Sequence, residues 1–500
     1  MIFEITYSFL FFLAVFFSLR YIKLFQIEGL KKWDLAFVFG LKSFAGLFFI
    51  YIFTWHYGPG YLYYDSSVYI SDAKILQSVF SYSPINFLKL LSGIGETKEL
   101  IETHLQNTHI WSQPNKIIHD DAKNIIRINS VIHFFSFGQI YIHFIVFNLF
   151  SIFGIVQIYL YFKKYIKINH RLFLFGLVIL PSFLFWGSGV LKEPMVIFVY
   201  GLLFWILRKP FEKKYLNYLS FLIIIYLLLN FKAYILVAII FPFSFIIFSK
   251  YIFPKMRLYY VLGIQFMLLF TSFLFMPNQW QVFVDNITDK QFDFNNITKG
   301  GIYLSTGSKK YDYQVPINQY DKIVKESDSV IFIKDVEIFQ LLKGKRHGLK
   351  KITMKADSLH KFKIKSIYRY SNSYIEPTLI LYSKKQLIKN IPISLVNSLL
   401  RPSWNDPSPK FKFLTILETY ILFAFLILAF IFRRKLNRNE QIMIITLALF
   451  VIILSLFIGW TTTVFGAIVR YRIFSYLIIL IISFILIKPF KEWKTKKNIS

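Results

Sequence analysis

Long apolar runs, separated by short clusters of Lys and Arg, repeat along most of this 500-residue chain. A helix needs about 20 mostly apolar residues to cross a hydrocarbon core ~30 Å thick, and many of these runs reach that length. With 56% hydrophobic residues, the composition is also that of a membrane protein. The sequence therefore predicts an all-α polytopic membrane protein.

The run pattern predicts about eleven transmembrane helices of roughly 16–25 residues each. They are centred on 5–19, 35–54, 134–161, 172–186, 195–207, 216–229, 234–248, 258–275, 413–432, 442–458 and 473–487. The N-terminus carries Glu4 and no early Lys or Arg, so the first run does not resemble a cleaved signal peptide, whose leading residues are basic. We expect this N-terminus to lie outside the membrane.

The net charge of +31, from 58 basic and 27 acidic residues, would suggest nucleic-acid binding in a soluble protein. Here the basic clusters fall in short loops between apolar runs, and such loops stay in the cytoplasm. We therefore expect no nucleic-acid partner and a C-terminus inside. The chain has no cysteine, which excludes disulfides, thiolate metal sites and cysteine nucleophiles.

Two stretches are too polar to span and are both predicted to lie outside. The first, 55–130, is expected to be a loop of a 1–275 transmembrane bundle, with one or two amphipathic helices such as 96–105. The second, 276–412, has short alternating apolar patches, which predict a small α/β or β-rich extracytoplasmic domain. Residues 413–500 return to the membrane and end in a basic cytoplasmic tail.

A Lys-Glu pair stands in GSGVLKEP, between two apolar runs. A charge at the bilayer centre costs ~2.5–3.5 kcal/mol on insertion scales, so Lys192 and Glu193 require an explanation. Two interpretations remain open. The pair lies at the outer membrane face and closes a helical hairpin, with Pro194 in the first turn of the next helix, or it belongs to a functional site.

Other charged residues next to apolar runs map to the same predicted face, which suggests one polar site. They are Asp65, Asp72, Lys232, Arg401, Glu418, Arg470 and Arg472. Each has a structural alternative: Asp65 as the cap of a helix over 68–78, Arg470 and Arg472 as interface anchors, and Glu418 as a bridge to Arg401.

Four short motifs resemble those of a known superfamily. Asp65 in the first large external loop resembles the acidic first-loop signature of the GT-C glycosyltransferases. The segments PSFLFWGSGVLKEP, RPSW before the helix bearing Glu418, and RYR near the end look like bacterial envelope proteins grouped with GT-C or O-antigen-polymerase-like enzymes. This sequence departs from the simplest GT-C pattern, since one extra helix precedes the acidic loop and no paired carboxylates stand at its start.

The resemblance implies a bacterial cytoplasmic-membrane enzyme that transfers a sugar from a polyprenol-phosphate donor to an envelope glycan or lipid at the outer face. Its partners would be this lipid-linked sugar or glycan and membrane lipid. Asp65 is the expected catalytic base, with Asp72 second. The leaving lipid phosphate needs positive charge. The candidate residues for binding the lipid phosphate or the substrate, including two carboxylates that would orient the cations, are Lys192, Glu193, Lys232, Arg401, Glu418, Arg470 and Arg472.

Weaker signals leave other functions open. A cluster of His104, His109, His119, Glu99, Glu102, Asp120 and Asp121 is compatible with a divalent cation, but it matches no compact metal motif, which favours a solvated face. No nucleotide-cofactor motif is present in its proper context. Two alternatives to the transferase remain: a polysaccharide polymerase or ligase acting on polyprenol-diphosphate-linked glycan, and a non-catalytic envelope scaffold or transporter.

Overall fold

The computed structural model describes residues 2–111, 121–208, 214–305, 311–342, 350–368, 371, 373–407 and 412–489. The chain divides into two compact units. The first unit comprises Met1–Phe243, Leu422–Leu447 and Tyr476–Ser500, and the second comprises Ser244–Ile421 and Ala448–Ser475. Helices α11, α16, α17 and α19 each contribute residues to both units.

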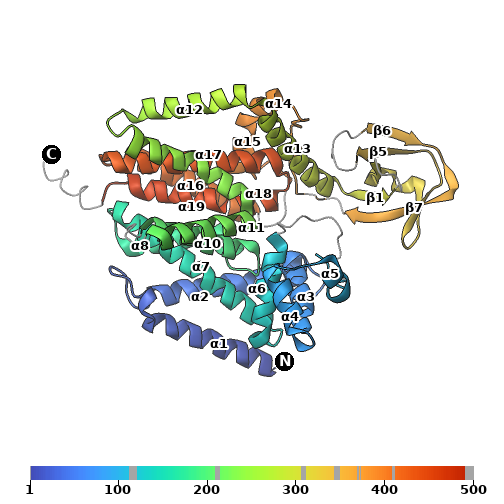
Figure 1. Cartoon of the computed structure of the whole chain (residues 1–500), viewed down its shortest axis with the longest axis horizontal. Coiled ribbons are helices and arrows are strands. Elements are labelled where there is room, and N and C mark those ends of the chain that lie inside the picture. The colour runs from blue at the N-terminus through green and yellow to red at the C-terminus, as the bar shows by residue number, and fades with distance from the viewer. Residues whose placement is uncertain are drawn as a thin grey trace. The chain divides into compact units, whose positions relative to one another are not determined.

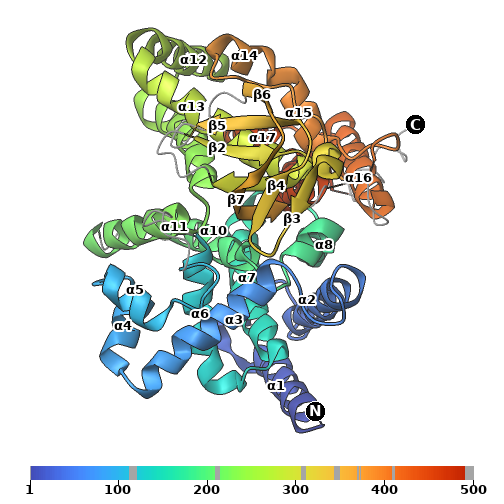
Figure 2. The same cartoon turned by 90° about the vertical axis from the view of Figure 1, so that its right-hand side faces the viewer.

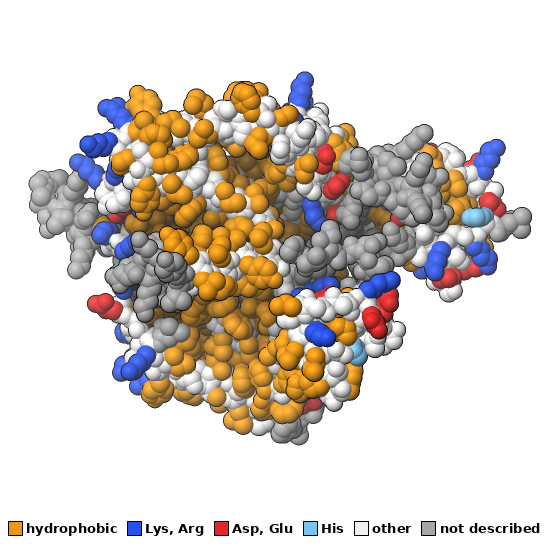
Figure 3. Space-filling model, in the orientation of Figure 1, with side chains coloured by type: hydrophobic (Ala, Val, Ile, Leu, Met, Phe, Trp, Pro, Cys, Tyr) orange, Lys and Arg blue, Asp and Glu red, His pale blue; other side chains and the backbone are white. Residues whose placement is uncertain are grey.

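The chain is mostly helical and has the helices of a multi-pass membrane protein. Among the described residues, seven helices are long and apolar enough to cross a membrane, or eight if a pair bent by 46° counts as one span. Hydrophobic side chains cover much of the helical surface that faces the viewer in Figure 3. Exposed apolar residues such as Phe44, Phe270 and Ile421 belong to three of these helices, as expected where lipid is the solvent.

Eleven crossings were expected, and that number is wrong for identifiable reasons. The run 172–186 is split into two short helices, α8 (His170–Ile179) and α9 (Pro181–Trp186), because Pro181 lacks the amide donor that would continue α8. Helix α10 (Lys192–Arg208) has only 17 residues. The runs 216–229 and 234–248 lie on the two sides of a kink at Lys232 within α11 (Lys214–Ile247), and this bent segment counts as one of the seven spans.

The first unit combines long helices with a group of shorter ones that lie together in Figure 2. The long helices are α1 (Ile2–Tyr21), α2 (Asp34–Tyr51), which continues as a π-helix over Ile52–His56, and α7 (Ile140–Phe162). The shorter ones are α3 (Asp65–Ser78), α4 (Pro84–Ser92), α5 (Lys98–His104) and α6 (Asp121–Ser136). The predicted 55–130 loop is therefore more helical than expected, and α5 falls within the predicted 96–105 segment.

Helices α7 and α10 run parallel in direct backbone contact. Phe198 packs on Phe150 and Phe204 packs on Tyr161, so both helices advance in the same direction. At the crossing, a Cβ added to Gly154 would lie 2.2 Å from the carbonyl oxygen of Ile197. Because only glycine permits this approach, Gly154 sets the distance between the two helices.

We expect Gly154→Ala to destabilise the protein by about 1–3 kcal/mol, because the added methyl must push α10 away from α7. Thermal unfolding in detergent measures this loss. Gly263→Ala in α12 (Leu258–Phe275) is the matched control, since this helical glycine has open space within 4 Å of the position that a Cβ would take. Equal melting temperatures for the two variants would contradict the role of Gly154.

The second unit contains the β structure predicted within 276–412. Helix α13 (Pro277–Lys299) leads into a seven-stranded antiparallel sheet of order β3-β4-β7-β1-β2-β5-β6. The strands are β1 (Gly301–Ser305), β2 (Tyr311–Val315), β3 (Ile323–Lys325), β4 (Ser329–Phe332), β5 (Val336–Leu342), β6 (Lys350–Met354) and β7 (Asp357–Tyr368). The expected β-rich segment is confirmed.

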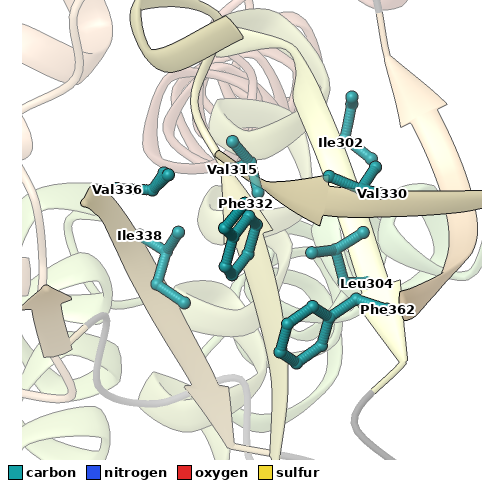
Figure 4. Packing of buried hydrophobic residues seen from close by; sticks show 8 residues of the cluster. All are labelled: Ile302, Leu304, Val315, Val330, Phe332, Val336, Ile338 and Phe362. Carbon is teal, nitrogen blue, oxygen red and sulfur yellow. The ribbon is translucent and has the colours of Figure 1, made fainter. Parts of the chain in front are cut away.

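Alternation of apolar residues builds the core of this sheet. The cluster drawn in Figure 4 includes Leu304, Val330, Phe332 and Ile338, all fully buried, and the ring of Phe332 stacks on Phe362 with centroids 4.8 Å apart. The α13 side chain Gln291 donates to the carbonyl of Trp460 at 2.9 Å. This bond ties the sheet's leading helix to the helical part of the same unit.

The remaining helices, seen in Figure 1, contribute residues first to the second unit and then to both units. They are α14 (Lys384–Lys389), α15 (Ile391–Leu399), α16 (Lys412–Ile431), α17 (Arg438–Thr461), α18 (Phe465–Tyr471) and α19 (Ile473–Leu486). Helices α18 and α19 form the bent pair.

Candidate functional site

The GSGVLKEP loop joins α9 to α10 and is held by a lysine from the apolar core. Lys42, in α2, is completely buried, and its ammonium donates to the carbonyl of Gly187 at 2.6 Å and to the hydroxyl of Ser188 at 3.1 Å. Sequence reasoning missed this residue, although a lysine well inside the predicted 35–54 crossing was a usable signal. Lys42 fixes the loop that presents Lys192 and Glu193.

We expect Lys42→Met to lower the free energy of unfolding by about 1–3 kcal/mol, because the buried Gly187 carbonyl loses its donor and the loop loses its anchor. Melting temperature in detergent reports this change. Lys74→Met in α3 removes an exposed lysine and is the control. A Lys42→Met protein that melts with the control would show that the loop is positioned by other contacts.

The start of α3 lies against the same loop. Ser66 donates to the carbonyl of Val190 at 3.0 Å, and the Lys192 ammonium lies 5.9 Å from the ring centre of Tyr69. The segment that carries Asp65 and the GSGVLKEP motif, both singled out in the sequence, are thus adjacent in the first unit. Asp65 is exposed. It is the first residue of α3, not its N-cap, which is Tyr64.

Lys192 and Glu193 each form an ion pair, and their partners differ. Lys192 donates to Asp121, the first residue of α6, at 2.6 Å. Glu193 lies 3.6 Å from Lys232, and these two side chains are only 2% and 7% exposed. Lys232 occupies the break in α11. The structure therefore gathers Asp65, Lys192, Glu193 and Lys232 around the starts of α3, α6 and α10.

Asp72 differs from Asp65 in its surroundings. It is fully buried, and its carboxylate accepts from the backbone N–H groups of His109 and Ile110 at 2.9 and 3.0 Å. The His109 ring nitrogen Nδ1 lies 3.0 Å from the same carboxylate, and the His109 side chain is 65% exposed. Asp72 thus orients an exposed imidazole that sequence reasoning had assigned only to a loose polar cluster.

A second carboxylate, Glu96, organises the segment that precedes α5 and the start of α6. It accepts from Lys123 at 2.7 Å, from Arg127 at 2.6 Å and from the Trp111 indole at 3.0 Å. Burial lowers the pKa of the Arg127 guanidinium, and the adjacent Glu96 opposes that shift. An arginine keeps its charge at physiological pH even so. This network holds α6, and with it Asp121, in place.

The acidic and histidine cluster does not form a metal site among the residues that the structure describes, where no three such side chains converge. Its members have other partners. His104 contacts Asn86 at 3.2 Å, and Asp121 pairs with Lys192. Two further members, His119 and Asp120, lie outside the described residues.

Aromatic rings surround the chain segment that leads into Asp65. Tyr64 packs against Tyr63 with centroids 4.7 Å apart and against Phe53 at 6.0 Å. Phe53 also contacts Trp186 at 6.2 Å, at the end of α9. Burial and the neighbouring Tyr64 raise the pKa of the Tyr57 hydroxyl, which stays protonated. The aromatic group therefore links α2 and α9 beside the first residue of α3.

The other predicted site residues form a group in the second unit. Arg472 is fully buried, not an exposed interface anchor, and donates to the carbonyls of Ser398 and Arg401 and to the Thr419 hydroxyl. Arg401 pairs with Asp406 at 3.7 Å, so the expected bridge to Glu418 is not the ion pair observed. Glu418 is 5% exposed in α16, next to Thr419. Arg470 is half-buried in α18.

The sequence matches no protein-family model, no curated protein and no solved structure.

Proposed function

We propose that this chain is an integral membrane glycosyltransferase that transfers a sugar from a polyprenol-phosphate donor to an envelope glycan or lipid acceptor. The observation that carries the proposal is the contact between the start of α3 and the GSGVLKEP loop, made by Ser66 and Val190. It sets an exposed carboxylate, Asp65, beside a lysine-bearing loop within one unit. A base and a nearby cation are what this reaction requires.

In the proposed reaction, Asp65 takes the proton of the acceptor hydroxyl. The acceptor oxygen then bonds to the anomeric carbon, and the bond from that carbon to the phosphate oxygen breaks with inversion. Polyprenol phosphate leaves with the bonding electrons. Asp72 is the weaker candidate for the base, because its oxygens already accept from the backbone N–H groups of His109 and Ile110 and contact the His109 ring.

The departing phosphate needs a positive charge, and Lys192 is the best-placed group in the first unit. Its side chain is 16% exposed, and its ammonium pairs with Asp121. Lys232 is buried against Glu193, so we assign these two residues to shaping the loop and the α11 break. Tyr63 and Tyr64, both exposed next to Asp65, are suited to packing against a sugar ring.

The proposal includes a location. The site would face the outside of a bacterial cytoplasmic membrane, where polyprenol-linked sugars are used, with the N-terminus outside and the basic C-terminal tail inside. The support is the charge distribution, since loops rich in Lys and Arg remain in the cytoplasm. Lys167, Arg434, Lys435 and Lys488 belong to such loops.

The test is the lipid-linked glycan profile of the native host. A deletion strain should accumulate a polyprenol-phosphate monosaccharide or an under-glycosylated product, and the wild-type gene should restore the normal profile. An unchanged profile in the deletion strain would contradict the proposal and would favour a scaffold or transporter.

A second candidate is a polysaccharide polymerase or ligase, favoured by the arginines of the second unit. Arg401 and Arg470 are both partly exposed there, which suits contact with a lipid diphosphate. On this alternative the deletion strain accumulates single repeat units on polyprenol diphosphate. Arg401→Ala and Arg470→Ala should then each fail to restore polymer, and polymer made by both variants would rule the alternative out.

A further inference from the structure

A basic cavity of about 560 Å³ lies in the first unit, lined by Lys167, Arg434, Lys435, Lys488 and Pro489. Its walls come from three segments that are remote in sequence: the chain after α7, the α16–α17 connection and the chain after α19. Because α7 and α10 run parallel, the cavity at the end of α7 lies at the opposite end of this pair from Lys192, which begins α10.

Arg434 holds the three wall segments together. Its guanidinium donates to the carbonyl of Ile485 at 3.0 Å and to the carbonyl of Tyr165 at 3.0 Å. It also binds both oxygens of Glu440, at 2.8 and 2.9 Å. These contacts neutralise the charge of Arg434 and give the cavity a preformed wall.

The other three cations are compensated less: Lys167 interacts with Glu440 only through space, and Lys435 and Lys488 have no carboxylate partner among the described residues. Lys167 and Lys435 are exposed and Lys488 is half-buried. None of them forms an ion pair with any residue that the structure describes. The carboxylate of Glu440 already accepts from Arg434 and from the backbone N–H of Asn437. Three like charges around one hollow repel each other unless an anion joins them.

We propose that this cavity binds the phosphate group of an anionic ligand, supplied either by a lipid headgroup or by a free phosphate. Lysine ammonium groups bind phosphate as point charges, and basic pockets between transmembrane helices are known sites for anionic headgroups. The volume is in the range of small-ligand sites. Each lysine could serve only to keep its loop in the cytoplasm, but that role does not require the three lysines to line the same cavity. The proposal stands whether or not the chain is a transferase.

The test compares two triple variants of the full-length protein in neutral detergent. Lys167→Gln/Lys435→Gln/Lys488→Gln removes the cavity charges. Lys23→Gln/Lys31→Gln/Lys32→Gln removes the same charge from exposed lysines of the α1–α2 connection and is the control. The readout is the shift in melting temperature with dihexanoyl-phosphatidylglycerol or inorganic phosphate, each against chloride at equal ionic strength.

We expect a saturable shift for the wild type and the control, and an apparent affinity about 100-fold weaker for the cavity variant. A shift with the phosphatidylglycerol alone identifies a lipid headgroup as the ligand, and an equal shift with phosphate identifies a free phosphate site. The proposal is overturned if neither probe exceeds chloride, or if the cavity variant responds as the control does. Melting temperatures without probe show whether each variant is folded.

Discussion

Asp65→Asn is expected to reduce the rate of sugar transfer about 10²–10⁴-fold, the usual contribution of a general base. The change replaces one oxygen of the carboxylate by an amide nitrogen, so the size of the side chain is kept and its basicity is lost. Asp65 is exposed at the start of α3, so its replacement should leave expression, membrane insertion and melting temperature unchanged.

The measurement is transfer from a polyprenol-phosphate sugar by purified protein, together with rescue of the deletion strain. Glu99→Gln in α5 is the control, because it neutralises a carboxylate in the same polar region between α2 and α7. Asp72→Asn should behave differently, since it weakens a buried anchor of the 109–110 backbone and should lower the melting temperature as well as the rate. Full activity in Asp65→Asn would remove Asp65 from the catalytic role.

Hydropathy predicted the class of the protein and the positions of most long helices, because burial in lipid demands long apolar runs whatever their neighbours are. It overcounted crossings where the outcome depends on local backbone chemistry. Pro181 ends one helix early, and the two helices of α11 meet at a kink at Lys232 although the NFKAY stretch there has neither Gly nor Pro. The presence of β strands was predicted because apolar and polar residues alternate within each strand, and this pattern depends only on the local sequence.

The candidate site was predictable only in part. The sequence singled out Asp65 and the Lys-Glu motif, and the structure brings them together in the first unit, which no spacing along the chain could establish. It also pointed to a single polar site that includes Arg401, Glu418, Arg470 and Arg472; these four belong to the second unit, and one shared site stays a prediction. Lys42 was missed and His109 was assigned only to a loose polar cluster, because their partners, Gly187 and Asp72, lie far away in sequence.

The second large effect is expected at the buried pair of Glu193 and Lys232. Glu193→Gln and Lys232→Met should each lower the free energy of unfolding by about 3–5 kcal/mol, because each leaves a charge buried without its counter-ion. The double variant should recover most of that loss, since it removes both charges and their desolvation cost. Denaturant unfolding of the four proteins gives the coupling energy directly.

The matched control is the pair of Glu337 and Lys351, which are 2.7 Å apart on the sheet but 46% and 58% exposed. Breaking that pair should change stability little, because water solvates each charge that remains. If the two pairs gave equal losses of stability, water would have to solvate the charges of Glu193 and Lys232. The GSGVLKEP loop would then be held chiefly by Lys42. A large coupling restricted to the buried pair would instead mean that the Lys-Glu motif determines how α10 meets the break in α11, and hence where Lys192 lies against Tyr69 of α3.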